Sequence, residues 1–146
     1  MADQTISTLN DLIETLKDGK NGFETAARDI SDGNVKTVFL QYAQERSRLA
    51  GELQAEVSKL GGEPETSGSA SAAMHRGWLN IKSALGGGEK AILDEAERGE
   101  DVAVRSFEKA LKEPLPTNVA SVVRRQYDQV KQAHDRVRGL RDSWKS

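Results

Sequence analysis

Four long segments of this chain repeat apolar residues at alternating intervals of three and four, which is the period of an amphipathic helix. None shows the strict alternation of a half-buried strand. The segments are residues 5–31, 35–60, 89–112 and 117–144. In the last of them, Val119, Val123, Val130 and Val137 fall on one helical face. Because helices of these lengths are each about 35–42 Å long, they can bury their stripes together as a bundle of four.

The links between these segments differ in length. Asp32-Gly33-Asn34 and residues 113–116 are short links, so each flanking pair is expected to be antiparallel, with Asn34 as the N-cap of the second helix. Residues 61–88 form a long link, within which residues 70–85 are predicted to form a short helix. One long link in the middle is the single-crossover topology of ferritin-like bundles, and an up-and-down bundle with the short helix packed outside is the alternative.

We therefore predict an all-α protein, a ferritin-like four-helix bundle with a long crossover that carries a short extra helix. Its 146 residues and 15.9 kDa correspond to one ordinary domain, residues 1–146. A turn-like cluster at residues 18–22 leaves the heptad phase unbroken, so the first helix is predicted to continue through it.

The composition excludes several classes of function. The chain has no cysteine and two histidines, which rules out disulfides, thiolate metal sites, cysteine nucleophiles and sites that need three imidazoles. With 21 basic and 23 acidic residues its formal net charge is −2, so a globally basic nucleic-acid binder is excluded. No secretory signal or membrane-length apolar run is visible, and we expect a cytoplasmic protein with no membrane partner.

Polar residues interrupt the apolar stripes. Lys20, Arg46 and Gln126 take stripe positions in the first, second and fourth helices. If they are buried they must meet partners, because an unpaired polar group in a core costs several kcal/mol, on the order of 2–7. Such a layer sets helix register, unless the long stems reach the surface. Gly51 and Gly99 lie in or beside stripes, where close helix approach is the usual explanation and a ligand cavity is the alternative.

A metal site is the sharper interpretation of the same polar residues. Ferritin-like di-iron proteins use one Glu from each of two helices and a Glu-x-x-His motif from each of the other two. Here Glu45 is followed three residues later by Arg48, and Lys131 stands three residues before His134. Both paired motifs are therefore broken, with cations in the places of ligands.

A weaker carboxylate site remains as the alternative. It would use Glu24, Glu45, Glu100 and His134 as ligands for iron or manganese. In the di-iron layout, Glu24 would be the lone Glu of the first helix, and Glu97 or Glu100 the lone Glu of the third.

The segment His75-Arg76-Gly77-Trp78 places a cation, an imidazole and one of two tryptophans on the predicted short helix. The simpler interpretation is that Trp78 anchors this helix to the bundle while Arg76 pairs with an acidic helix. A lid that binds a small molecule or a partner is the alternative.

Several motifs taken together resemble a known family. They are His75-Arg76-Gly77-Trp78, Glu97-Arg98-Gly99-Glu100-Asp101, Gln126-Tyr127 with His134-Asp135, Glu45-Arg46, and Gly61-Gly62-Glu63-Pro64. In these motifs the chain is similar, from about Ile6 to Leu140, to a bacterial ferritin-like four-helix-bundle family classed as a domain of unknown function. The resemblance implies a ferritin-like bundle in a bacterial cytoplasm and no established activity. It carries over no metal site, because the Glu-x-x-His pairs are missing.

The sequence thus favours a non-enzymatic helical bundle that acts through interaction or small-ligand binding and needs no cofactor. A homo-oligomer or a complex with a protein partner is compatible with the clean heptads. The competing class is a metal-dependent oxidoreductase or metal store.

Overall fold

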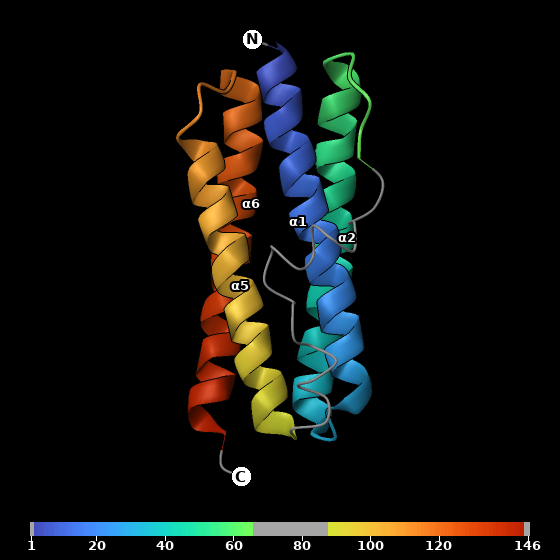
Figure 1. Cartoon of the computed structure of the whole chain (residues 1–146), viewed down its shortest axis with the longest axis vertical. Coiled ribbons are helices and arrows are strands. Elements are labelled where there is room, and N and C mark those ends of the chain that lie inside the picture. Colours follow the sequence, from blue (N-terminus) through green and yellow to red (C-terminus); the bar gives the residue numbers. More distant parts are fainter. Residues whose placement is uncertain (1, 66–87, 145–146) are drawn as a thin grey trace.

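The computed structural model describes residues 2–65 and 88–144, which form four α-helices (Figure 1). The helices are α1 (Ala2–Asp29), α2 (Gly33–Lys59), α5 (Glu89–Leu111) and α6 (Thr117–Ser143). No strand occurs among these residues, which confirms the prediction of an all-α four-helix bundle. The predicted short helix at residues 70–85 lies outside the described residues. None of the four helices is both long and apolar enough to cross a membrane.

Each helix packs against two neighbours. α1 packs against α2 and α5, and α6 packs against α5 and α2, so α2 and α5 face each other across a diagonal. In the view of Figure 1, α1 and α6 run downward while α2 and α5 run upward. Every neighbouring pair is therefore antiparallel, and α2 ends at the opposite end of the bundle from the start of α5.

The reversal between α1 and α2 is capped by Asp32. Its Oδ1 accepts hydrogen bonds from the backbone N–H groups of Asn34, at 2.9 Å, and Val35, at 3.1 Å. The prediction that Asn34 caps α2 is wrong, because the helix already begins at Gly33. Asn34 and Val35 are then the second and third residues of the helix, whose N–H groups have no helical partner, and a side-chain oxygen at residue 32 is placed to accept from them.

A glycine pair ends α2, as the sequence predicts. Gly61 has φ +81°, a conformation that L side chains rarely adopt. The Gly61 N–H donates to the carbonyl of Ser58 and the Gly62 N–H donates to that of Val57, each at 3.0 Å, which is the Schellman pattern. A Cβ on Gly62 would lie 2.8 Å from the side chain of Ile6, so this glycine also permits close packing of α1 on the end of α2.

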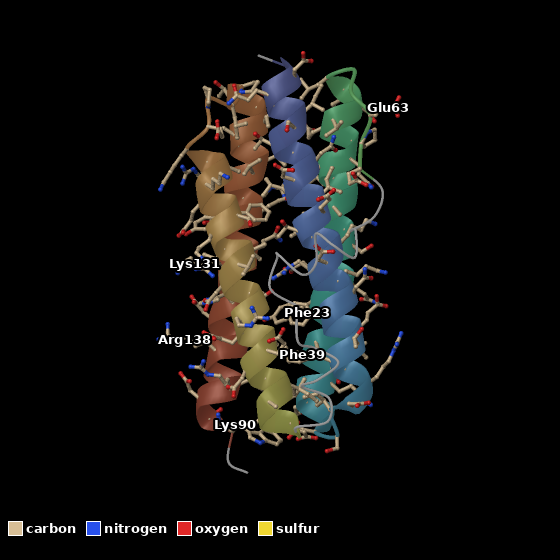
Figure 2. All side chains as sticks on the ribbon, in the orientation of Figure 1. Phe23, Phe39, Glu63, Lys90, Lys131 and Arg138 are labelled. Carbon is tan, nitrogen blue, oxygen red and sulfur yellow. The ribbon has the colours of Figure 1, made fainter. Side chains whose placement is uncertain are left out.

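The core consists of two apolar clusters, one in each half of the bundle. One contains Leu9, Leu49, Phe107 and Val123 among its members, and the other is built around Phe23. The Phe23 ring lies edge to face with that of Phe39, with centroids 5.2 Å apart. Figure 2 shows Phe23 and Phe39 inside the bundle, whereas Lys131 and Arg138 point away from it.

Two residues singled out in the sequence, Lys20 and Gly51, have different surroundings from those expected. α1 is continuous through residues 18–22, as predicted, but Lys20 is only half-buried and its Nζ pairs with Glu24. Its neighbours Asp18 and Gly19 are the buried residues at that level, because they lie on the face of α1 that is turned to the core. Close helix approach does not explain Gly51, which is exposed and where an added Cβ would meet nothing within 4 Å.

Candidate functional site in the centre of the bundle

A polar layer separates the two apolar clusters. Along α2 it falls at Arg46, and along α5 it falls at Gly99 and Glu100. Along α1 it falls at Asp18 and Gly19. The stripe of each of these helices is therefore interrupted at the same height of the bundle, so the polar groups lie at one level and can meet.

The centre of this layer is an ion pair between Arg46 and Glu100, which we call the central ion pair. Arg46 Nη2 donates to Glu100 Oε2 at 2.5 Å, and both side chains are 0% exposed. The pair joins α2 to α5 across the diagonal, where the two backbones make no close contact. The prediction that the buried polar residues of the stripes would need partners is thus confirmed at Arg46.

Two features of α1 accommodate the guanidinium. Its central carbon lies 5.4 Å from the centroid of the Phe23 ring, within the range of a cation–π interaction. Gly19 leaves room beside it, since a Cβ at that position would lie 2.8 Å from Arg46 Nη1. α1 therefore supplies both an aromatic face and a gap for the charge.

The central layer keeps unused hydrogen-bonding capacity. Arg46 Nε and Nη1, Glu100 Oε1 and Glu45 Oε1 are buried without a hydrogen-bond partner among the described residues. Burial raises the pKa of Glu45, against the opposing charges of Arg46 and Arg48, and the charge of Glu100 raises it further. The guanidinium thus lies in a desolvated layer that holds more than one carboxyl group.

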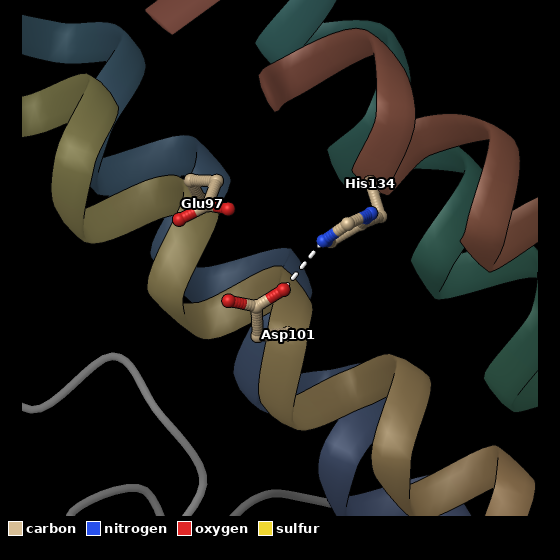
Figure 3. Close-up of side chains that lie close together, drawn as sticks. All are labelled: Glu97, Asp101 and His134. Carbon is tan, nitrogen blue, oxygen red and sulfur yellow. Dashed lines mark hydrogen bonds and ion pairs between the residues drawn. The ribbon is translucent and has the colours of Figure 1, made fainter.

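A second polar group lies nearby, where α5 faces α6. It consists of Glu97, Asp101 and His134, which we call the seam cluster (Figure 3). Glu97 and Asp101 are four residues apart on one face of α5, and the imidazole of His134 approaches them from α6. His134 Nε2 lies 2.5 Å from Asp101 Oδ1, and one donor atom from each of the three residues lies within 4.8 Å of the others.

Flanking residues hold the seam cluster in place. His134 Nδ1 lies 3.1 Å from Asp135 Oδ1, and Arg141 Nη1 donates to Glu97 Oε2 at 3.0 Å. Burial favours the neutral imidazole, but hydrogen bonds to Asp135 and Asp101 outweigh it, so that the pKa of His134 is raised from 6.5. The charge of Glu100 acts in the same direction.

The structure brings together some of the sequence-predicted metal ligands. Glu45 and Glu100 lie close enough for their charges to influence each other, and Glu100 influences His134 in the same way. Glu24 lies apart from them, because its carboxylate pairs with Lys20 Nζ at 3.0 Å and lines a groove on the outer side of α1 and α2. His134 contacts Asp101, which the sequence analysis did not single out as a ligand.

One pattern in the sequence could have indicated Asp101. Glu97 and Asp101 have the spacing that places two carboxylates on one helical face. The sequence alone does not predict how α6 is rotated about its axis, and this rotation turns His134 toward that face. The other histidine, His75, lies with the rest of the His75-Arg76-Gly77-Trp78 segment outside the described residues.

Gln126 is the third predicted stripe residue, and it joins α6 to α2. It is fully buried, and its Nε2 donates to the carbonyl of Leu49 at 3.1 Å and to Glu52 Oε1 at 2.7 Å. Arg125 forms an ion pair with the same Glu52 carboxylate at the surface. These bonds set the position of α6 along α2. Of the neighbouring helix pairs, α2 and α6 have the least contact with each other.

A polar groove of about 420 Å³ lies between α1 and α5, away from the central layer. Gln4, Ser7, Thr8 and Asp11 of α1 line one side of it, and Lys109 of α5 lines the other. This volume is within the range of small-molecule sites, which is roughly 300–1,000 Å³.

The fold and the central layer define a four-helix-bundle protein whose interior is crossed by an ion pair. Residues 4–113 match the family described as "Domain of unknown function (DUF2383)", and the chain belongs to that family. No curated protein matches the chain.

Proposed function

We propose that this protein is a non-enzymatic, ferritin-like bundle of the bacterial cytoplasm that acts by binding a partner or a small ligand. The central ion pair is the observation that carries the proposal. In this view the polar layer holds the helices in register, and binding takes place on the outer surfaces of the bundle.

The directions of the helices support the ferritin-like topology. α2 and α5 run in the same direction on a diagonal, while α1–α2 and α5–α6 are antiparallel pairs. The end of α2 and the start of α5 lie at opposite ends of the bundle. In ferritin-like folds the second and third long helices are placed in this way and are joined by one long crossover.

The residues of the central layer do not fit the di-iron centre that this topology houses in other proteins. Such a centre needs carboxylates and imidazoles that converge from four helices. Here the guanidinium of Arg46 is bound to Glu100, and Glu24 is bound to Lys20. A metal pair between the helices would have to displace a buried guanidinium and leave that charge without its partner, which costs about 3–5 kcal/mol.

The groove between α1 and α5 supports the small-ligand form of the proposal. Its lining offers hydroxyl groups and charges of both signs, which suits a small polar compound. The hydroxyl of Thr15 in this groove already donates to the carbonyl of Asp11, so it is the other polar side chains of the lining that would bind a ligand.

Metal analysis of protein purified without chelator tests the proposal against the competing metal-dependent oxidoreductase or metal store. The informative variant is Glu45→Gln, because Glu45 lies in the central layer but outside the central ion pair and the seam cluster. We expect the iron and manganese content of the wild type and of this variant to be the same. Stoichiometric iron or manganese in the wild type that is lost in Glu45→Gln would overturn the proposal. The mass in solution distinguishes a self-associating bundle from a monomer.

A further inference from the structure

We propose that the seam cluster of Glu97, Asp101 and His134 binds one divalent ion of a first-row transition metal. This site is separate from the central layer and does not depend on the proposed function. It uses one helical face of α5 and one residue of α6, rather than ligands from all four helices.

The spacing of the donor atoms fits a single ion. Imidazole nitrogens and carboxylate oxygens bind such ions at about 2.0–2.2 Å, which places the donors of one ion roughly 3–4.4 Å apart. One donor atom from each residue of the seam cluster lies within 4.8 Å of the other two.

A metal ion can take the place of a proton in the contact between His134 and Asp101. Nε2 lies 2.5 Å from Oδ1, where the imidazole N–H donates to the carboxylate when no metal is bound. Figure 3 shows that Glu97 faces the same space from one turn earlier on α5. An ion in place of that proton would have Glu97 as a third donor.

The neighbours of the cluster have the arrangement of a supporting shell. Asp135 accepts from His134 Nδ1 and thereby directs Nε2 toward Asp101, which is the common way in which proteins orient a ligating histidine. Arg141 holds Glu97 through Oε2 and leaves Oε1 for an ion. The imidazole is 11% exposed and Asp101 is 44% exposed, so the site is enclosed by protein on one side and open to water on the other.

The chemistry of the donors and the local charge point to the class of ion. Glu97, Asp101 and Asp135 are acidic, whereas Arg141 pairs with the carboxylate of Glu97 and Arg105 donates to the backbone carbonyl of Asp101. A net negative site attracts a dication. One imidazole with two carboxylates suits zinc, manganese or ferrous iron, whereas calcium and magnesium prefer oxygen ligands alone.

Calorimetric titration of the chelator-treated full chain with Zn²⁺ near neutral pH tests this site. We expect one ion per chain, with affinity lowered at least about tenfold in Asp101→Asn and in His134→Gln. Asp135→Asn removes the orienting carboxylate and is expected to weaken binding by about 10–100-fold. Circular dichroism of each metal-free variant establishes that the helices are retained.

Two variants outside the seam cluster serve as matched controls. His75→Gln removes the other histidine of the sequence, and Asp128→Asn removes an exposed carboxylate of α6 outside the cluster. Both are expected to bind Zn²⁺ within about twofold of the wild type, a difference of about 0.4 kcal/mol. Absence of Zn²⁺ binding in the wild type, or equal affinity in Asp101→Asn and wild type, would overturn the site. Loss of Zn²⁺ binding in Glu45→Gln would instead count against the proposed function.

Discussion

Arg46 is the largest side chain that the described part of the chain buries completely. A buried charge is tolerated when its partner and its hydrogen bonds compensate for lost hydration. Glu100 provides the partner and Phe23 an aromatic face, but two of the guanidinium nitrogens have no hydrogen bond among the described residues. The central ion pair is therefore better understood as a device for register than as a large source of stability.

Removing the charge of one member of the central ion pair is expected to lower the free energy of unfolding far more than replacing both members. Glu100→Gln leaves Arg46 as an unpaired buried charge and should lower the free energy of unfolding by about 3–5 kcal/mol. The double variant Arg46→Met with Glu100→Leu removes both charges and should recover most of that loss. Chemical denaturation of the wild type and the variants measures these differences. Equal losses in the single and double variants would show that the charges are not coupled.

The sequence identified Arg46 but not its partner. An arginine in an apolar stripe stands out at once, because the neighbouring stripe positions are aliphatic. On α5, however, Glu95, Glu97 and Glu100 all lie near the stripe, and only the rotation of that helix decides among them. The structure pairs Glu95 with Arg98 of the same helix, which leaves Glu100 to cross the bundle.

At the scale of the helix, the start of α2 depends on a single side chain. Asp32→Ala removes the acceptor for the Asn34 and Val35 N–H groups and should lower the free energy of unfolding by about 1 kcal/mol. Asn34→Ala is the matched control, since Asn34 caps nothing and its replacement should change stability by less than about 0.5 kcal/mol. Thermal unfolding distinguishes them, and a larger loss in the Asn34 variant would restore Asn34 as the cap.

Two glycines inside helices are expected to respond oppositely to alanine. Gly51→Ala adds a methyl group where nothing lies within 4 Å, so it should stabilise the protein by about 0.5–1 kcal/mol through helix propensity. Gly19→Ala gains the same propensity but pushes on Arg46 Nη1, 2.8 Å from the new Cβ, and should destabilise.

The free energy of unfolding of Gly19→Ala, measured in the Arg46→Met background, tests whether contact with Arg46 causes the destabilisation. There the guanidinium is gone, and Gly19→Ala should become neutral or stabilising. A loss that persists in that background would mean that the backbone, rather than Arg46, requires glycine at this position.

The elements themselves followed closely from the sequence, because heptad periodicity and the Gly and Pro stops are local signals. The predicted ends of the four helices lie within three residues of the observed ones. The cap of α2 was mistaken because Asp32 and Asn34 are both good N-caps, and the choice depends on where the first helical turn begins. The lack of close packing at Gly51 depends on tertiary contacts that a single sequence does not specify.

At the scale of the whole molecule, the contact between α5 and α6 makes stability depend on pH. The pKa of His134 is raised in the folded state, so its favourable contribution is complete below the unfolded pKa of about 6.5 and is lost as pH rises through the folded pKa. Asp135 on α6 and Asp101 and Glu100 on α5 favour the charged imidazole, and Arg141 pairs with Glu97 of the same cluster.

The pH dependence of stability is measured on the metal-free protein. With chelator present, the difference in unfolding free energy between the wild type and His134→Gln should be largest near about pH 6 and should shrink toward about pH 9. Comparing the two proteins at each pH cancels the other titrating groups, among them Glu45 and Tyr42. A difference that stays constant or grows with pH would contradict the assignment of the raised pKa to His134.

The central claim is that the middle of the bundle is closed by Arg46 and Glu100, and that any bound metal lies at the α5–α6 seam. X-ray diffraction from crystals grown with Mn²⁺ or Zn²⁺, recorded at the absorption edge of the metal, locates both directly. We predict an anomalous peak beside His134 and Asp101, with the guanidinium of Arg46 in contact with Glu100. An anomalous peak between Glu45 and Glu100, with Arg46 turned away, would contradict the account.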